Sequence, residues 1–381
     1  MNNWQIKKLG DISVINGGGT PPTSHAEYFT GNVPWFTPSE ITSGTVSVLT
    51  SSERQITEEA IKHSKIAEQG TVLLSSRATI GHVGIVATRS TYNQGIKGLT
   101  PKKELLPWYL AYWLLASKKR LEKSSFGTTF KELSTTALKK FDIEIPPISV
   151  QQQVVEKLDA IKRMQELNQK EITKVKELFN SHLSRAFRPQ TGGTIKRLGE
   201  LFLRSSRTVL PITLGDKLVN YIGLENIESN TGRLVSFSPC TAKTIKSAKT
   251  KFSKGDTLYG KLRPYLNKVW LATMDGICST DIWVLKAQEN MIRLELLPIL
   301  LRFPEIVKQT LAGMTGTNLP RVNAKTFDYI EIAVLPIEKQ KLLIEEVMKI
   351  QIYQQSLQTE NEKLSQLFDS ALNKFMKPNQ I

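Results

Sequence analysis

Two groups of polar and basic residues in this sequence have side chains suited to nucleic-acid contacts. Arg, Lys, Asn and Gln can form paired hydrogen bonds with base edges, whereas Lys, Arg, Ser and Thr can hold phosphate oxygens. The first group, on polar turns between probable strands, contains Ser76, Arg77, Thr79, Asn93, Gln94 and Lys97. The second is a basic and aromatic ribbon of Lys261, Arg263, Tyr265, Asn267 and Lys268, followed by a polar turn of Ser279, Thr280 and Asp281. The alternative interpretation is a set of solvated loops without a ligand, and Tyr265 could equally belong to a core.

Two matched loops add further candidate contacts. Gly127-Thr-Thr-Phe-Lys131 and Gly316-Thr-Asn-Leu-Pro-Arg321 each precede the last strand that we expect in their half of the chain. A shared role in contacting a nucleic-acid backbone is one hypothesis, and a purely structural turn is the other. The candidate contact residues in these loops are Thr128, Lys131, Thr317, Asn318 and Arg321.

The charge balance favours a polyanionic partner. The 381 residues include 51 Lys and Arg against 35 Asp and Glu, a net charge of +16. Nucleic acid and an acidic membrane surface both fit this charge. No apolar run reaches the ~18 residues that a membrane span needs, and the N-terminal MNNWQIKKLG lacks the apolar segment of a secretion signal. We therefore expect a cytoplasmic protein without a membrane partner, and the presence of only two cysteines agrees with a reducing compartment.

The motifs of several enzyme classes are missing from the sequence. An adenine methyltransferase would need an Asn/Asp-Pro-Pro-Tyr/Phe loop, and a nucleotide-driven motor would need GxxxxGK[ST] to hold phosphates. Gly17-Gly-Gly-Thr20 has no Lys after it and is better explained as a bend. Clustered His and Cys are lacking as well, so no zinc site is indicated. We expect a non-catalytic recognition protein that binds no cofactor or metal of its own.

The elements that must position these residues are two long helical repeats. Apolar positions alternate in steps of four and three from Val154 to Ala186, and again from Leu343 to Phe375, at a constant offset of 189 (343 minus 154). This narrow seam favours helix pairing, and the copies can pair antiparallel within one chain. Two ordinary amphipathic helices on separate cores are the alternative. Polar residues that could fix the register lie in both seams, at Gln165, Asn168, Gln354 and Asn361.

The whole chain repeats with the helices. Ile195-Lys-Arg-Leu-Gly199 repeats Ile6-Lys-Lys-Leu-Gly10 at the same offset (199 minus 10). The predicted fold is therefore α+β, with two mixed α/β domains joined by two long antiparallel coiled-coil helices and a pseudo-twofold internal duplication. The predicted boundaries are 1–147 for the first domain, 148–188 for the first helix, 189–336 for the second domain and 337–381 for the second helix.

Local patterns predict several elements of the first domain. β-branched runs between Gly, Pro and Ser clusters indicate strands at Asp11–Ile15, Thr71–Leu74, Val83–Ala87 and Phe141–Ile145. Helices are predicted at Thr57–Lys65, with a capped start, and at Pro107–Lys123, with Pro in the first turn.

Beyond the repeat, the sequence resembles the specificity subunits of type I restriction-modification systems over almost its full length. Gly19-Thr-Pro-Pro22, the segment from Glu27 to Phe36 and Asn93-Gln-Gly95 are similar to one variety of this family's target-recognition domain. Tyr221–Ile227, Gly255–Lys268 and Gly276–Asp281 are similar to another variety. Together with the duplicated helix, these motifs identify the chain as a member of the family.

The resemblance implies a function that charge and periodicity alone do not give. Each domain would read half of a bipartite double-stranded DNA sequence, and the helices would set the gap. Two methyltransferase subunits, which carry S-adenosylmethionine and methylate adenine, would dock on the chain, and restriction subunits with translocating activity could join. Two alternatives stay open: the recognition subunit of a type II system that cuts on both sides of its site, and a non-enzymatic coiled-coil interaction scaffold.

Overall fold

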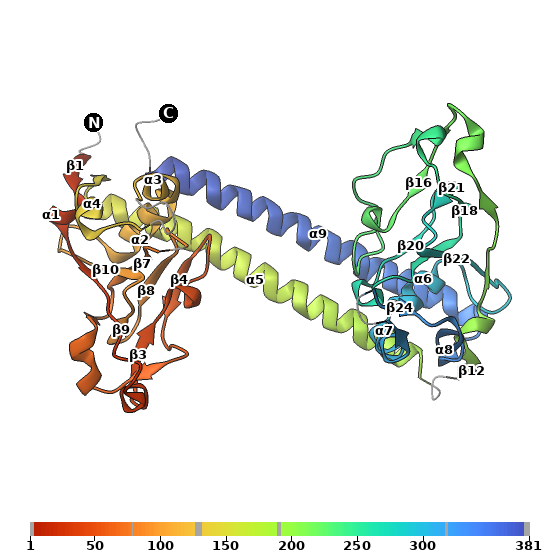
Figure 1. The fold of residues 1–381 in the computed structure, drawn as a ribbon, viewed down its shortest axis with the longest axis horizontal. Coiled ribbons are helices and arrows are strands. Elements are labelled where there is room, and N and C mark those ends of the chain that lie inside the picture. The colour runs from red at the N-terminus through yellow and green to blue at the C-terminus, as the bar shows by residue number, and fades with distance from the viewer. Residues whose placement is uncertain (1–3, 78, 126–131, 189–191, 317–318, 377–381) are drawn as a thin grey trace. The chain divides into compact units, whose positions relative to one another are not determined.

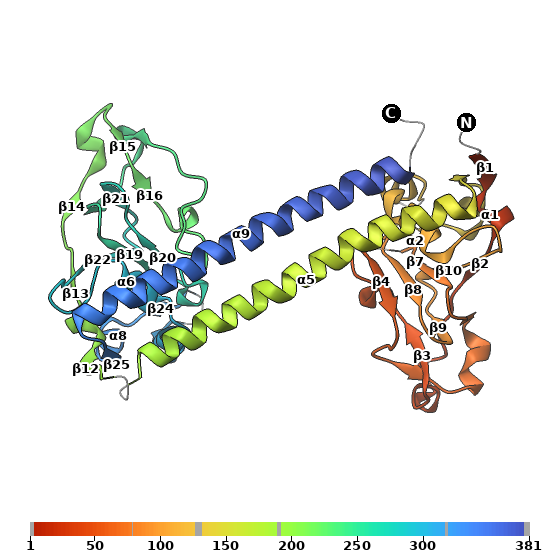
Figure 2. The same ribbon diagram turned by 180° about the vertical axis from the view of Figure 1, so that it is seen from behind.

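A computed structural model of the protein describes residues 4–77, 79–125, 132–188, 192–316 and 319–376. The chain forms two compact units: Met1–Gln169 together with Thr359–Ile381, and Lys170–Gln358. Two long helices, α5 (Ile148–Ala186) and α9 (Ile337–Met376), contribute to both units. Each is drawn as one unbroken helix in Figures 1 and 2. The domain boundaries predicted from the sequence divide the chain by its repeat, whereas the two units are defined by spatial contacts and divide both long helices. The predicted boundaries therefore stay a prediction.

The first unit is built on a five-stranded sheet with the order β2-β10-β7-β8-β4. Its strands are β2 (Ser13–Gly17), β10 (Ile96–Pro101), β7 (Val72–Ser75), β8 (Val83–Val86) and β4 (Val46–Leu49). Neighbours pair antiparallel except β4 and β8, which are parallel. Helix α2 (Pro107–Ala116) packs on this sheet, and seven of its residues are buried, as expected for a helix that is apolar on all sides. The remaining helices are α1 (Leu9–Ile12), α3 (Lys118–Lys123) and α4 (Thr135–Lys139).

A smaller lobe of the first unit has its own sheet and core. The sheet has the order β5-β3-β9-β6, formed by β5 (Gln55–Ile56), β3 (Val33–Phe36), β9 (Ser90–Tyr92) and β6 (Ile66–Ala67). Val33, Trp35, Ile56 and Ala60 form a separate small hydrophobic cluster. The lobe also contains the 3-10 turns η1 (Ala26–Phe29), η2 (Pro38–Glu40) and η3 (Glu59–His63).

The second unit repeats this plan with shorter strands. Its main sheet has the order β13-β22-β19-β20, from β13 (Phe202–Arg204), β22 (Ile282–Ala287), β19 (Thr257–Gly260) and β20 (Val269–Leu271). The lobe sheet has the order β14-β18-β21-β16, from β14 (Thr208–Val209), β18 (Lys249–Phe252), β21 (Gly276–Cys278) and β16 (Tyr221–Ile222). Short pairs join β15 (Leu218–Val219) to β17 (Cys240–Thr241), and β23 (Met314–Thr315) to β24 (Arg321–Val322).

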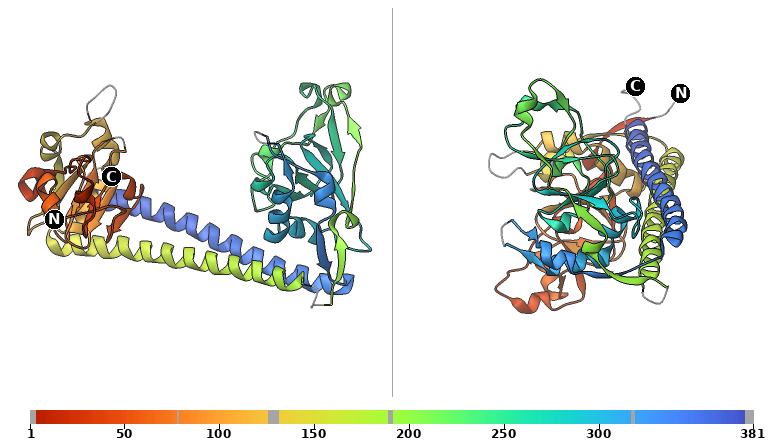
Figure 3. Two further views of the ribbon diagram at one scale, coloured as in Figure 1. Left: turned by 60° about the horizontal axis from the view of Figure 1, so that its bottom comes forward. Right: turned by 90° about the vertical axis from the view of Figure 1, so that its right-hand side faces the viewer.

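Short helices complete the second unit, as Figure 3 also shows. The α-helices are α6 (Leu296–Leu301), α7 (Pro304–Ala312) and α8 (Ala324–Asp328). The 3-10 turns are η5 (Leu198–Glu200), η6 (Pro211–Leu214), η7 (Leu224–Asn226), η8 (Ala242–Thr244) and η9 (Pro264–Leu266).

The strand pair beside each long helix repeats position by position. In the first unit β1 (Gln5–Lys8) pairs with β11 (Asp142–Ile145), and in the second β12 (Thr194–Arg197) pairs with β25 (Glu331–Val334). Both strands of the second pair follow their counterparts at the offset of 189 seen in the sequence (194 minus 5 and 331 minus 142), and both pairs have the same antiparallel register. This repetition confirms the predicted internal duplication.

Gly10 and Gly199 repeat as a second matched pair. A Cβ on Gly10 would lie 2.9 Å from Cβ of Lys139, and one on Gly199 would lie 2.8 Å from Cβ of Asp328. Both distances are too short for a carbon contact, so each position requires glycine for the same close approach.

The predicted helical seams are confirmed by burial and packing. Val154 and Leu158 of α5 share a core with Phe368 of α9 in the first unit. In the second unit, the later part of α5 shares a core with the early part of α9, through Leu183 and Val347. The helices therefore pair antiparallel within each unit.

The polar seam residue Asn168 is the least compensated position of the long helices. It is 7% exposed, and neither its amide nitrogen nor its amide oxygen has a hydrogen-bond partner in the described structure. Burying an unpartnered amide lowers stability. Such a loss of stability is expected of a polar seam residue that fixes the register of paired helices, which is the role predicted for Asn168 from the sequence.

Three predicted elements differ from the structure. Leu9 and Ile12 are both fully buried three residues apart, so the start of the predicted strand Asp11–Ile15 is the helical turn α1, and β2 begins only at Ser13. The predicted helix Pro107–Lys123 is divided at Ser117 into α2 and α3.

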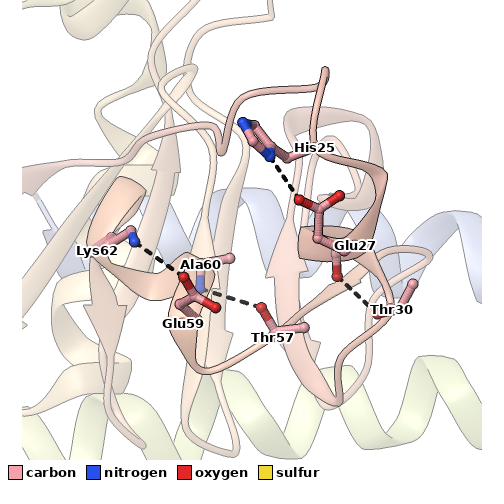
Figure 4. Close-up of polar contacts among 7 residues, drawn as sticks. All are labelled: His25, Glu27, Thr30, Thr57, Glu59, Ala60 and Lys62. Atoms are coloured by element: carbon pink, nitrogen blue, oxygen red, sulfur yellow. Dashed lines mark hydrogen bonds and ion pairs between the residues drawn. The ribbon is translucent and has the colours of Figure 1, made fainter.

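The predicted helix at Thr57–Lys65 is only the 3-10 turn η3. Thr57 Oγ1 accepts a hydrogen bond of 3.3 Å from the Ala60 backbone N–H, and Lys62 pairs with Glu59 at 3.4 Å (Figure 4). The capping signal in the sequence therefore corresponds to a real contact. It closes a single turn because the chain enters β6 immediately afterwards.

Candidate nucleic-acid interface

Three chain segments meet at the end of β7 in the first unit. The Ser76 backbone N–H donates to the Gly95 carbonyl at 2.8 Å, and the Ser76 carbonyl accepts from the Leu133 N–H at 2.9 Å. Beside them, Arg77 and Glu132 form an isolated β-bridge. We call the residues 76–77, 93–95 and 132–133 the first polar edge.

Glu132 forms ion pairs with two of the predicted contact residues of this edge. Its carboxylate oxygens lie 2.9 Å from the guanidinium of Arg77 and 3.4 Å from Nζ of Lys97. The hydrogen bond from Arg77 holds the pKa of this carboxyl below its usual range. The carboxylate therefore stays charged and fixes the orientation of Arg77, whose side chain remains exposed to solvent.

The structure separates the first group of candidates into exposed and buried side chains. Ser76 is fully buried and its hydroxyl donates to the Gly95 carbonyl at 3.0 Å, while Lys97 is only 6% exposed. The Asn93 side-chain oxygen accepts from the Gly95 N–H at 2.9 Å and so closes the turn. The exposed candidates that can reach a ligand directly are Arg77, Thr79 and Gln94.

The second unit builds the same edge from different side chains. The Lys261 N–H donates to the Asp281 carbonyl at 3.0 Å, and the Lys261 carbonyl accepts from the Val322 N–H at 2.9 Å. Leu262 and Arg321 form the isolated bridge that corresponds to the one between Arg77 and Glu132. We call the residues 261–268, 279–281 and 319–322 the second polar edge.

The exposed side chains of the second polar edge are basic, aromatic and hydroxylic. Arg263, Thr280 and Arg321 are exposed, and Arg321 lies 3.5 Å from the carboxylate of Asp281. Tyr265 is 51% exposed, so it does not belong to the core. Lys261 is half-buried. Nζ of Lys268 donates to the Leu224 carbonyl at 2.7 Å, which ties this Lys to the lobe.

Four of the predicted contact residues lie outside the described residues. They are Thr128, Lys131, Thr317 and Asn318. Their assignment stays a prediction, as does the contact role of the exposed candidates.

Sequence reasoning places Asp281 in the polar turn of the second group but misses Glu132. Glu132 lies beside the guanidinium of Arg77 and Asp281 beside that of Arg321, although residue type alone favours cations and neutral hydrogen-bonding side chains as ligand contacts. The position of Glu132 in the repeat was the available signal. Glu132 precedes a strand-like Leu133 in the first unit just as Arg321 precedes Val322 in the second, again at an offset of 189 (321 minus 132).

Hydrogen bonds from the long helices hold the domain of each unit. In the first unit, Nζ of Lys162 in α5 donates to the Val46 carbonyl in β4 at 2.7 Å. Burial lowers the pKa of this ammonium, and the contact compensates for part of its lost hydration. In the second unit, Arg233 donates to the side-chain oxygen of Gln355 in α9 at 2.6 Å.

Other classes of site find no support in the part of the chain that the structure describes. No group of three or more His, Cys, Asp or Glu residues there is arranged to hold a metal ion. Within the described residues, no helix combines the length and apolar character that crossing a membrane requires.

Comparison with known proteins identifies the family. Residues 1–177 match the type I restriction modification DNA specificity domain. This part of the chain, 177 of its 381 residues, is a type I restriction-modification DNA specificity domain. The chain is 38% identical to the MjaIX specificity subunit of Methanocaldococcus jannaschii over 157 residues, which are 40% of this chain and 36% of that one.

Two further similarities extend over nearly the whole chain. Identity to the EcoDI specificity subunit of Escherichia coli is 22% over 395 aligned positions, covering 93% of this chain and 83% of the relative. The crystal structure of the type I S subunit from M. genitalium has a TM-score of 0.59 and 16% identity, and covers 98% of this chain and 96% of that chain. This structural likeness supports the fold, whereas the stronger sequence match spans well under half of the MjaIX subunit.

Proposed function

We propose that this specificity subunit recognises a bipartite sequence in double-stranded DNA, with one polar edge reading each half. The proposal is based on one observation: the same arrangement of backbone hydrogen bonds occurs in both polar edges, but the exposed side chains around it differ. Ser76 and Lys261 make the same two backbone hydrogen bonds, yet the exposed residues around them differ. Two similar frames with different side chains are what two different half-sites require, because base edges are distinguished by side-chain donors and acceptors.

The charge of the chain supports DNA as the ligand. The net charge of +16 allows many phosphate contacts, which supply most of the sequence-independent affinity of a DNA-binding protein. Within the edges, the carboxylates of Glu132 and Asp281 lie 2.9 Å and 3.5 Å from the guanidinium groups of Arg77 and Arg321, which stay exposed. An oriented guanidinium is suited to the paired contact with guanine that discriminates between bases.

The long helices support docking of two copies of one partner. Large apolar side chains are exposed at pairs of positions related by the offset of 189 (353 minus 164, 367 minus 178): Met164 at 51% and Tyr353 at 46%, Leu178 at 56% and Leu367 at 52%. Each compact unit holds one member of each pair. Matched apolar positions outside the seam are typical of protein interfaces.

We assign these surfaces to two methyltransferase subunits, to which restriction subunits with translocating activity can be added. The chemistry then resides in the partners. The methyltransferase subunits would bind S-adenosylmethionine and transfer its methyl group to adenine, while this chain selects the sequence. It would bind no cofactor itself.

A titration of labelled DNA against the full chain with its methyltransferase partner tests the proposal. Selection from a random library gives the candidate site, and binding is then measured against competitor DNA at increasing salt. Specific recognition predicts at least ~10³-fold preference for the selected site. Uniform weak binding with a steep salt dependence would instead identify an interaction scaffold with incidental DNA affinity.

A further inference from the structure

The turn after β19 holds two residues in a backbone conformation that non-glycine residues rarely adopt. Arg263 has φ of 52° and Asn267 has φ of 47°, on either side of the 3-10 turn η9. Asparagine tolerates this region better than most residues, whereas an arginine keeps it only where surrounding contacts fix it. The exposed candidates Arg263 and Tyr265 lie in this turn, so its conformation sets where their side chains project.

Asn267 is fixed by the loop around Asn230. The Asn230 N–H donates to the Asn267 carbonyl at 3.1 Å, and the Asn267 side-chain amide donates to Oδ1 of Asn230 at 3.1 Å. The same amide lies 3.3 Å from the Arg302 carbonyl. Asn230 is itself left-handed, with φ of 65°.

The first unit shows that the backbone conformation alone does not require asparagine. Gly81 lies two residues before β8, as Asn267 lies two residues before β20, and Gly81 has φ of 91°. Glycine adopts this region without steric cost. The additional feature at Asn267 is therefore its side-chain amide, which bonds to the neighbouring loop.

The loop around Asn230 is connected in turn to α9. Glu228 accepts hydrogen bonds from Thr231 at 2.6 Å and from Nε of Arg233 at 2.9 Å, and its N–H donates to the Arg233 carbonyl at 2.9 Å. Arg233 then donates to Gln355 of α9 at 2.6 Å. Hydrogen bonds at both ends of the short loop 228–233 thus connect the long helix, through the covalent chain between Thr231 and Asn230, to the left-handed turn.

We propose that residues 228–233 form a strut between α9 and the turn 263–267. By holding this turn in place, the strut determines how the second polar edge reads its half-site. Asn267, Asn230 and Arg233 are positioning residues, and none of them needs to contact DNA. On the opposite side, the Arg263 N–H donates to the Pro320 carbonyl at 2.8 Å, so the turn is held from two directions. The inference rests on the proposed DNA recognition.

Asn267→Gly is the sharpest test, because it keeps the left-handed backbone accessible while removing the amide. Asn290→Gly, in an exposed turn of the same unit, is the matched control. Each full-length chain, bound to its methyltransferase partner, is used to select sites from a DNA library. Asn267→Gly should reduce discrimination at the second half-site about tenfold, the scale of one lost base contact, and leave the first unchanged. Gln355→Ala, on α9 and outside the turn, should have a smaller effect in the same direction.

Backbone amide exchange of the free chain provides a readout that is independent of DNA. Faster exchange at 263–268 in Asn267→Gly and in Gln355→Ala supports the strut. Two results would overturn the proposal. One is an unchanged exchange rate at the turn in both variants. The other is a lowered unfolding midpoint with unchanged discrimination at the second half-site. A parental chain that selects no bipartite site would instead count against the proposed function, and the exchange measurement would still decide the strut.

Discussion

Gln151 and Gln340 make the same three hydrogen bonds, each within its own unit and at matched positions of the repeat (340 minus 151 is again 189). The Gln151 side chain accepts from the Leu106 N–H and donates to the carbonyls of Glu104 and Pro146, all at 2.9 Å. Gln340 accepts from Arg293 at 2.9 Å and donates to Met291 and Leu335 at 2.8 Å. Both glutamines are fully buried in the first turn of a long helix, so each locks that helix to its domain.

Removing either glutamine should destabilise the corresponding unit. Gln151→Ala leaves one N–H and two carbonyl groups without their partner, which should cost about 2 kcal/mol or more of unfolding free energy. Gln340→Ala should cost a similar amount. Urea unfolding of the full chain measures both, with the exposed Gln152→Ala as control. Equal midpoints for Gln151→Ala and Gln152→Ala would show that these bonds contribute little.

The ion pairs of Glu132 predict an acid-dependent loss of stability. Its folded-state pKa lies below the ordinary value of 4.5 because Arg77, and then Lys97, favour the carboxylate. The stabilisation is therefore complete above the unfolded-state pKa and is lost as the pH falls through the lower folded-state pKa. Unfolding midpoints measured between about pH 7 and 3 should fall less steeply in Glu132→Gln than in the parental chain. Exposed Glu122→Gln is the control, and identical pH profiles for parent and Glu132→Gln would refute the assignment.

The isolated chain should transfer no methyl group. The sequence lacks the Asn/Asp-Pro-Pro-Tyr/Phe loop that an adenine methyltransferase needs for the flipped base. Incubation with labelled S-adenosylmethionine and DNA should give label in DNA only when the methyltransferase subunit is added. Incorporation by the purified chain alone would show that it carries catalytic residues of its own.

The repeat made the helices, the duplication and the frame predictable from sequence. Periodic apolar positions are a local signal, and the constant offset appears when the chain is aligned with itself. The side-chain environment of the edges was not predictable in the same way. Ser76 and Lys97 look like ligand contacts by residue type. However, Ser76 is buried with its hydroxyl bonded to the Gly95 carbonyl, and Lys97 pairs with Glu132. Likewise, the role of Asn267 depends on Asn230, which is 37 residues earlier in the chain. Such contacts between distant segments leave no periodic signal.

The paired helices should act as a ruler between the two half-sites. Inserting one heptad into each helix, after Asn168 and after Leu357, preserves both seams and lengthens them by about 10 Å. At ~3.4 Å per base pair, the preferred gap should grow by roughly three base pairs. The rotation of about 100° that accompanies this change should lower affinity even at the best gap. Selection with fixed half-sites and variable gaps reports the preferred spacing for parent and mutant. An unchanged gap, with both proteins folded and bound to methyltransferase subunits, would leave the helices a role in assembly only.

Independent reading of two half-sites is tested most directly by exchanging one domain. A chain in which residues 1–147 are replaced by the corresponding domain of another specificity subunit is assembled with its methyltransferase partner. The methylated sequence is then determined by sequencing the modified DNA. One half of the recognised sequence should change to that of the donor while the other half stays as in the parent. A change in both halves, or in neither, would contradict the assignment of one half-site to each polar edge.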